Sequence, residues 1–555
     1  MSGAGHGHGR RQDQSEAPTK GAWNSAIFII LVETAERFGY YGVAGNLVTY
    51  LTKVLGEPIV AAAKSVNTWV GVSSLFPILG GFIADSYLGR FATILVFCSI
   101  YLAGLTLLTL SVSTVPRRMR RAFFYVALYI TALGEGGHKP CVQTFAADQF
   151  DEDTPAQRRS KSSFFNWWYL GIVLGSTTAV LVVIYVEDSV SWTVGFGMPT
   201  VAVAASLAVF LMGIRRYRRN RPPGSPFTRV AQVVVAAARK RRVVREGSKE
   251  TTARTRSSLF RWLDRAAIAD KEDSPAAAAA CEFGKGRTGD PWRVCPQGQV
   301  EEVKQVLRLI PIWLCCFVFF VATAQMSTFF TKQGSTLDRS LFPGHRFRIP
   351  AASLQALPGL TILAFVPVYD RILVPYVRAA TGHPKGITVL TRMALGLLSV
   401  TLTMAVSALV EVKRVGVARS HDPAATLPMR VWWLAPQYLL VGVSDGLMVV
   451  GMQELFYDEM PEEMRSVGAA AYISTIGVGN LLSSALISVV QSATGGGGGG
   501  GGGWLVNNLN RAHLERFYGL LACLNALNLG VYLWVTRGFS YANIGGPAHL
   551  AGYLY

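Results

Sequence analysis

The chain has 555 residues, of which 50% are hydrophobic and only 16% are charged, and its mean hydropathy is +0.31. This composition excludes an ordinary soluble protein and indicates a membrane protein with several spans. The formal net charge of +19 would suit a nucleic-acid-binding protein. However, the basic residues cluster between the apolar segments, most densely at 215–265, which is typical of the cytosolic loops of a multi-span protein.

The seven cysteines have no disulfide or metal-site spacing, and most of them lie in or beside apolar segments, where a thiol is a small hydrophobe. Residues 1–22 are polar and rich in Gly and His, which predicts a disordered cytosolic tail and no cleavable signal. His6 and His8 could contact a metal, but a flexible tail is the preferred interpretation. The sequence therefore predicts no bound metal and no cofactor.

The first apolar segment, roughly 26–51, contains three charged residues, Glu33, Glu36 and Arg37. On a helix these positions are i, i+3 and i+4, so the three side chains share one face. An unpaired trio at the centre of a membrane would cost about 8–10 kcal/mol. We therefore expect this face to look into a polar cavity; the alternative is a salt bridge that only holds helices together.

Hydropathy predicts an all-α membrane protein with twelve spans, six on each side of a long basic segment. Their centres lie near residues 38, 75, 101, 134, 174, 204, 319, 362, 398, 444, 479 and 525. The expected parts are a cytosolic tail at 1–22, a six-helix bundle at 23–214, a basic cytosolic linker at 215–303, a second six-helix bundle at 304–537 and a cytosolic tail at 538–555.

A weak internal repeat supports two six-helix halves. Asp85 ends the second span and is followed by Gly89 and Arg90, while Asp370 and Arg371 end the eighth span. With the N-terminus in the cytosol, both motifs and the long linker lie on the cytosolic side, although the basic loop at 116–121 does not fit this orientation. Secondary transporters commonly place their site between paired halves that move around it. We therefore interpret these two motifs, one in each half, as gating elements.

The linker contains a basic segment at 227–245 that could lie on anionic headgroups as a helix. Its glycine-rich stretch at 284–289 looks like a phosphate-binding loop, but it follows no strand and lacks the Gly-Lys-Ser/Thr ending. We therefore interpret that stretch as linker, and the absence of a nucleotide motif speaks against an ATP-driven pump.

Two further spans carry buried charges. Lys139 lies in the middle of the fourth span with Glu135 one turn before it, and Glu454 lies in the tenth. Glu135 either pairs with Lys139 or faces a neighbouring helix. Asp445 lies about 180° around the tenth span from Glu454, so we expect a packed or protonated helix–helix contact there rather than a cavity residue.

Several motifs resemble those of the proton-dependent oligopeptide transporter family. These are Glu-x-x-Glu-Arg-Phe-x-Tyr-Tyr-Gly from Glu33, residues 81–90, residues 148–151 and residues 164–169. Residues 337–339, 369–371 and 509–514 resemble its plant branch, the nitrate and peptide transporters. The similarity runs from about residue 22 to 537. It implies the major facilitator fold, alternating access between two half-molecules, and proton-driven uptake.

The same resemblance implies roles for individual residues. Glu33, Glu36 and Arg37 match the proton-coupling motif of the family. The expected proton-coupling and substrate-binding residues are then Glu33, Glu36, Arg37, Tyr41, Lys139, Asn166, Thr323, Gln325 and Glu454, together with Glu135, which its helical spacing from Lys139 adds. Two positions depart from the family: Ala44 stands where bacterial peptide transporters carry a second arginine, and Thr323 stands where a plant nitrate transporter has histidine.

Charge arithmetic gives a mechanism. Glu33, Glu36 and Glu454 against Arg37 and Lys139 leave one negative charge, so one bound proton makes the cavity neutral and easier to close. Proton and solute then favour the same closed state. Adding Glu135 raises the deficit to two negative charges.

The sequence predicts a transporter, not an enzyme, with protons, a small nitrogenous solute and the lipid bilayer as its partners. We favour nitrate over di- or tripeptides, because Ala44 removes a cation suited to a peptide carboxylate. Hormone or glucosinolate transport, and a sensor without transport, remain alternatives, and the plasma membrane and the vacuolar membrane are both open. Thr93, three residues after Arg90, is either a regulatory kinase site or a simple helix-start threonine.

Overall fold

The computed structural model describes residues 21, 23–150, 155–219, 226–240, 260–267, 292–341, 348–381, 387–422, 426–460, 465–495, 503–537 and 539. Within these ranges the regular structure is helical apart from one two-stranded sheet. Ten helical segments there are long and apolar enough to cross a membrane. Two further long helices, α1 (Trp23–Ala44) and α5 (Arg117–Ala147), contain the predicted intramembrane charges of the first half and complete twelve spans. The twelve-span all-α membrane fold predicted from hydropathy is confirmed.

The N-terminal half contains the first six spans. Its other α-helices are α2 (Leu47–Lys53), α3 (Ile59–Ile83), α4 (Arg90–Ser113), α6 (Pro155–Thr178), α7 (Ile184–Ser189) and α8 (Trp192–Met212). Two short π-helical turns, η1 (Ala84–Leu88) and η2 (Ala179–Val183), continue α3 and α6. Lipid offers no partner to a free N–H or C=O, so breaks within spans are bridged by helical turns rather than by open loops.

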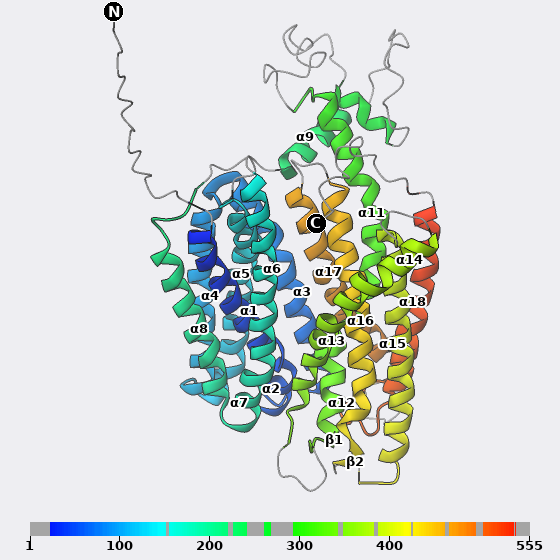
Figure 1. Ribbon diagram of the computed structural model, residues 1–555. Helices are drawn as coiled ribbons and strands as arrows, with labels where there is room; N and C mark the ends of the chain where they lie inside the picture. The colour runs from blue at the N-terminus through cyan, green and yellow to red at the C-terminus, as the bar shows by residue number, and fades with distance from the viewer. Residues whose placement is uncertain are drawn as a thin grey trace, which may run out of the picture.

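The C-terminal half contains the other six spans and is interrupted in the same way. Its elements are α11 (Gln297–Thr323), η4 (Met326–Phe330), α12 (Thr331–Thr336), η5 (Ala351–Gln355), α13 (Ala356–Val368), η6 (Tyr369–Leu373), α14 (Val374–Thr381), α15 (Val389–Ala418), η7 (Val431–Leu434), α16 (Ala435–Asp458), α17 (Arg465–Ala493) and α18 (Leu514–Arg537). Figure 1 shows the two halves as adjacent bundles, with the linker elements at one end.

The halves are in contact along α3 and α17. A Cβ on Gly71 would lie 2.7 Å from Cγ of Leu481, and a Cβ on Gly477 would lie 2.9 Å from the carbonyl oxygen of Gly71. Glycine at these two positions lets the helices approach closely, as small residues do in membrane helix pairs.

A short parallel sheet marks the end of the molecule opposite the linker (Figure 1). Its strands are β1 (Leu337–Asp338) and β2 (Leu427–Arg430), with Leu337 paired to Leu427 and Asp338 to Arg430. The hydroxyl and the N–H of Ser340 both donate to Oδ1 of Asp338, at 2.5 and 3.1 Å, and hold the pKa of that carboxyl below its usual value.

The linker has a small apolar core of its own. Helix α9 (Pro226–Arg239) and the 3₁₀ turn η3 (Arg261–Ala267) pack against the start of α11 through Val233, Leu263 and Val300. The predicted basic helix at 227–245 is therefore corrected: α9 ends at Arg239 and buries its apolar face here, not on headgroups. The predicted boundary at 303/304 also moves, because α11 already begins at Gln297. Residues 284–289, 1–20 and 540–555 lie outside the described residues.

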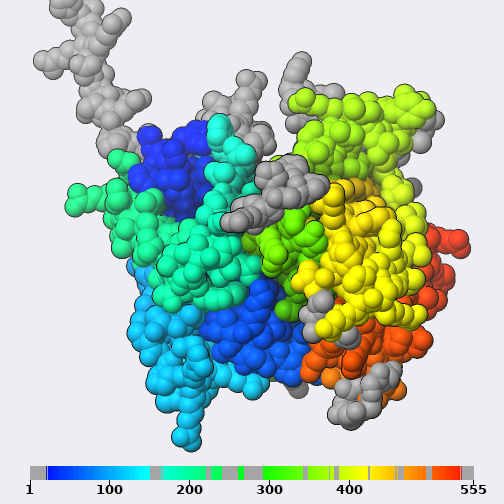
Figure 2. Space-filling view, turned by 90° about the horizontal axis from the view of Figure 1, so that it is seen from below, coloured from blue at the N-terminus to red at the C-terminus, as the bar shows by residue number. Residues whose placement is uncertain are grey.

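Hydrogen bonds between described residues of the two halves are confined to the β1–β2 end. Asn67 of the first half donates to Ser483 Oγ of the second at 3.1 Å, and Gln355 of the second donates to the carbonyl oxygen of Gly45 at 2.8 Å. Arg339 reaches Asp188 at 3.0 Å. Figure 2, seen from this end, shows the blue and cyan atoms of the first half lying against the green, yellow and orange atoms of the second. The halves are thus joined at the β1–β2 end.

Candidate functional site

The charges of α1 form a compact buried cluster. Arg37 Nε lies 2.8 Å from Glu33 Oε1 and 2.8 Å from Glu36 Oε2, on one helix face as their spacing predicts. The glutamate side chains are 5% and 2% exposed and that of Arg37 is 11% exposed. Glu33 Oε2 and Glu36 Oε1 are buried and have no hydrogen-bond partner within the described residues. A carboxylate oxygen in this position is suited to receive a proton, because protonation removes an uncompensated buried charge.

Helix α5 places a second ion pair beside this trio. Lys139 Nζ lies 2.8 Å from Glu135 Oε1 and 4.6 Å from the centre of the Tyr40 ring, which connects α5 to α1. Glu135 is 1% exposed and also interacts electrostatically with Glu36 and Arg37. Of the two predicted positions for Glu135, the one beside Lys139 is found. The N-terminal half therefore gathers three carboxylates and two cations, a net charge of −1 without Glu454.

Close helix packing makes this cluster possible. A Cβ on Gly39 of α1 would lie 2.7 Å from the Tyr101 hydroxyl of α4, so only glycine allows α1 this close to α4. Tyr41 is half-buried and packs where Val180 and Ile184 of the first half meet Ala352 and Ala356 of the second. The predicted cavity tyrosine thus lies at the contact between the halves.

Glu454 is held by its own half. Its Oε2 lies 3.8 Å from Arg392 Nη1 of α15, and Arg392 also donates to the carbonyl oxygen of Gly446 at 3.0 Å and lies over the Tyr369 ring. The carboxylate therefore faces a cation that the sequence analysis did not select. An arginine inside an apolar segment was the available signal, but its partner lies 62 positions further along the chain.

Asp445 lies on the tenth span, α16, as the sequence predicts. The side chain is partly exposed and interacts electrostatically with Tyr472 of α17, which interacts in turn with Tyr41 and Arg37 of α1. The expected packed or protonated helix–helix contact of Asp445 therefore stays a prediction.

Gln325 differs from its predicted substrate-binding position. It is fully buried, and its Nε2 donates to Val321 O and to Ser483 Oγ, both at 2.9 Å. Because Asn67 also reaches Ser483, Gln325 belongs to the junction between the halves in this conformation. Thr323 ends α11 and is half-buried. The side chain of Asn166 lies outside the described residues.

The motif after the second span forms a local ion-pair cluster. Arg90 Nη1 lies 2.5 Å from Asp148 Oδ2, and its Nε lies 3.7 Å from Asp85 Oδ1, which joins the α3–α4 turn to the end of α5. Gly89 has φ of +75°, a conformation that favours glycine. In the second half Arg371 is exposed, and the side chain of Asp370 lies outside the described residues.

Thr93 is not accessible as a phosphorylation site in this conformation. It is fully buried, and its hydroxyl donates to the carbonyl oxygen of Gly89 at 2.9 Å. Because the side chain is buried, the kinase-site hypothesis is replaced by the alternative, a simple threonine of the first helical turn. The sequence pattern around Arg90 does not show whether this threonine is buried.

One residue beside the charged cluster, His138, was not predicted from the sequence as a site residue. His138 is 1% exposed, interacts electrostatically with Glu36, and has no hydrogen-bond partner for either ring nitrogen within the described residues. A histidine in the middle of an apolar segment was the available signal. It adds a second kind of titratable group next to the glutamates.

Comparison with known proteins agrees with this arrangement. Residues 91–504 match the sequence profile of the POT family. The chain is 48% identical over 549 residues to Protein NRT1/ PTR FAMILY 5.4 of Arabidopsis thaliana, covering 95% of this chain and 96% of that protein. It is 45% identical to Protein NRT1/ PTR FAMILY 5.10 of the same plant, covering 94% and 93%.

Solved structures show the same architecture. The crystal structure of an auto-inhibited POT family peptide transporter is similar with a TM-score of 0.72 at 25% identity, covering 94% of this chain and 99% of that one. The POT family transporter PepTSo shares the fold with a TM-score of 0.68 at 22% identity, covering 92% and 98%. The chain therefore belongs to the POT family, among relatives of the plant NRT1/PTR proteins, and is a proton-coupled integral membrane transporter rather than an enzyme.

Proposed function

We propose that this chain is a proton symporter that moves a small nitrogenous solute, with nitrate as the favoured substrate, by alternating access. The observation that supports this proposal is the buried cluster of Glu33, Glu36 and Glu135 around Arg37 and Lys139, with its net charge of −1. One proton neutralises the cluster and weakens the ion pair between one carboxylate and its cation. The released guanidinium or ammonium then binds the anion, so proton and anion favour the same state.

The orientation of the proposed transport cycle follows from the junction between the halves. Positive-inside topology puts the basic linker in the cytosol, so the joined β1–β2 end faces the other compartment. In this conformation we infer access to the cluster from the cytosolic side. Lys139 is 20% exposed although it lies in the middle of a span, which supports a polar path to it.

A di- or tripeptide remains the second candidate, and Asp445 is the observation that favours it. Tyr472 interacts electrostatically with both Asp445 and Arg37. A carboxylate and a guanidinium that act on the same tyrosine suit a solute with a positive and a negative end. Nitrate needs only the cation.

Uptake by oocytes that express the chain separates the two substrates. We expect labelled nitrate to accumulate several-fold more at acidic than at neutral pH, with an inward current, and a dipeptide to show little accumulation. Acid-stimulated dipeptide uptake without nitrate uptake would transfer the proposal to peptides. Uptake of both that ignores pH would contradict proton coupling.

Replacing Glu135 tests the charge arithmetic of the cluster. In Glu135→Thr the net charge becomes zero without a proton, so uptake should survive with a weaker dependence on acidic pH. Glu135→Gln is the matched variant, because it keeps the size of the side chain while removing the same charge. Both should flatten the pH profile of initial uptake rates. If only abundance falls and the profile is unchanged, Glu135 has a structural role alone.

A further inference from the structure

A second polar site lies at the β1–β2 end, where the two halves meet. It is a surface cavity of about 390 Å³ that is open to the surroundings. Thr52, Lys53 and Glu57 of α2 and the turn after it line one side, and Lys332 of α12 and Asn507 line the other. None of these residues belongs to the charged cluster of α1 and α5, so the cavity is separate from the proposed transport site.

Lys332 is the unusual residue of this cavity. It is 6% exposed, and its Nζ donates to Thr52 Oγ1 at 2.7 Å across the contact between the halves. Within the described residues no carboxylate pairs with it. Other buried cations do have such partners: Arg414 has Glu411, and Lys304 has Asp264. A buried ammonium with one neutral acceptor has donor capacity left and an uncompensated charge, which an anion would balance.

The carboxylates around the cavity are already engaged. Asp188 accepts from Lys53 at 2.8 Å and from Arg339 at 3.0 Å. Glu57 is 3.0 Å from both Arg121 Nε and the Tyr125 hydroxyl. Lys332 therefore adds a positive charge to a group in which each acid is matched by at least one cation.

The balance of charge follows from these pairs. Three cations, Lys53, Lys332 and Arg121, and two carboxylates, Glu57 and Asp188, line the cavity or bind its lining residues, which leaves one positive charge. This excess excludes a cation as the ligand and favours a small anion.

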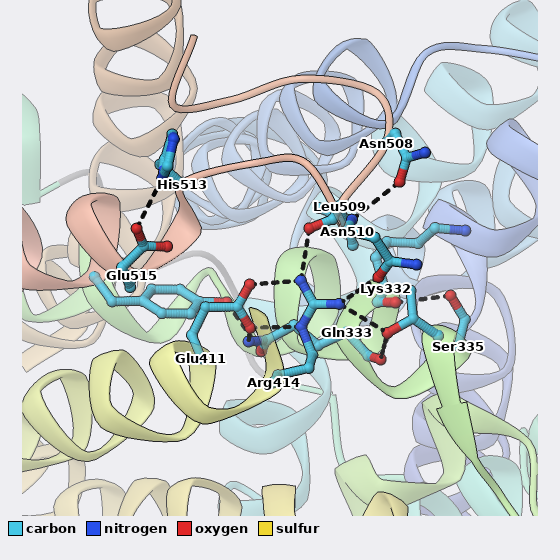
Figure 3. A network of polar contacts seen from close by, with 12 residues as sticks. Lys332, Gln333, Ser335, Glu411, Arg414, Asn508, Leu509, Asn510, His513 and Glu515 are labelled. Carbon is cyan, nitrogen blue, oxygen red and sulfur yellow. Dashed lines mark hydrogen bonds and ion pairs between the residues drawn. The ribbon is translucent and has the colours of Figure 1, made fainter. Parts of the chain in front are cut away.

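The two walls from the C-terminal half are held by one buried ion pair. Arg414 Nη2 lies 2.6 Å from Glu411 Oε1, and neither side chain is exposed. Glu411 accepts from Gln333, the neighbour of Lys332, at 2.5 Å, and Arg414 donates to the carbonyl oxygen of Leu509 at 2.6 Å. Figure 3 shows α12 and the chain at 508–510 converging on Arg414. Lys332 and Asn507 are therefore held in place on a rigid framework rather than on a free loop.

We propose that this cavity binds a small inorganic anion, such as chloride or nitrate, held by Lys332 with Lys53 and Thr52. The anion contacts α2 of one half and α12 of the other. Because these contacts exist only while the halves are joined at this end, bound anion stabilises the joined conformation by mass action.

The test uses the full chain in phosphatidylcholine nanodiscs. Sodium chloride or sodium nitrate replaces sodium gluconate at constant ionic strength, and hydrogen exchange is followed in peptides covering 47–59 and 331–336. We expect either small anion to slow exchange in both segments together. The half-saturating concentration should rise by about tenfold in Lys332→Gln, as expected for the loss of one charge-assisted contact.

Two further variants make the result specific. Lys64 also reaches across the halves, to Gln491 at 3.2 Å, but it does not line the cavity, so Lys64→Gln should keep the wild-type half-saturation. Lys53 is 47% exposed, so Lys53→Gln should fold normally, and it should bind the anion more weakly than the wild type. This variant tests the proposal if Lys332→Gln does not fold.

Three outcomes would overturn the proposal. These are no anion-dependent protection in the wild type, unchanged half-saturation in both Lys332→Gln and Lys53→Gln, and protection that requires anionic lipid, which would assign the site to a headgroup. The chloride measurement does not depend on which solute is transported. Failure of the proposed nitrate transport would therefore leave this result intact, and the reverse also holds.

Discussion

Replacing Glu36 by glutamine is expected to abolish acid-stimulated uptake while leaving the protein at the cell surface. Glu36 is 2% exposed, pairs with Arg37 at 2.8 Å, and has a second oxygen without a hydrogen-bond partner in the described part of the chain. Glutamine keeps the size and the polar contact but cannot exchange a proton at this position. The ratio of uptake at acidic and at neutral pH should therefore fall to about one, consistent with the loss of a coupled proton.

The control for this variant is a glutamate outside the cluster. Glu301 pairs with Lys304 at 2.9 Å at the start of α11, and Glu301→Gln should keep the acid stimulation. Surface labelling of both variants measures abundance independently of transport. Normal acid-driven accumulation in Glu36→Gln would remove Glu36 from the coupling mechanism.

Replacing Glu411 by glutamine is expected to destabilise the protein strongly. The carboxylate accepts from Arg414 Nη2 and Nε at 2.6 and 2.7 Å, and both side chains are completely buried. Removing one partner leaves an uncompensated guanidinium in a low-dielectric interior, at a cost of about 3–5 kcal/mol. We expect a marked fall in thermal stability and in abundance.

A double variant distinguishes this cause from a general intolerance of mutation. Glu411→Gln combined with Arg414→Met removes both charges, so it should recover part of the stability lost in Glu411→Gln. Thermal unfolding of the purified variants measures the difference. If the double variant is less stable than the single one, the hydrogen bonds of Arg414 to Leu509 and Asn510 matter more than charge balance.

Glu36 and Glu411 are both buried charges, but they have different roles. The cluster around Arg37 has unpartnered carboxylate oxygens and a net charge, so its energy depends on protonation. The pair Glu411–Arg414 is neutral and each charged group has several partners, so it fixes geometry instead. This difference explains why one set of charges is suited to coupling and the other to holding α12 in place.

The local arrangement of the first-half charges was predictable because it lies within single helices. The period of 3.6 residues places Glu33, Glu36 and Arg37 together, and Glu135 beside Lys139, whatever the neighbouring helices are. Hydropathy likewise determines twelve spans and two halves, because the bilayer requires apolar segments of a minimum length. These features depend on near neighbours in the sequence and on the solvent alone.

The tertiary structure decided which helix faces meet. Glu454 pairs with Arg392 on another span, Gln325 is buried in the junction between the halves, and Thr93 is enclosed by its neighbours. The apolar core of the linker and the cavity around Lys332 also combine segments that are far apart in the chain. Most spans are apolar around much of their circumference, since lipid and protein interior accept the same side chains. A sequence pattern therefore shows where a helix crosses the membrane, whereas packing against the other helices determines which of its residues line a site.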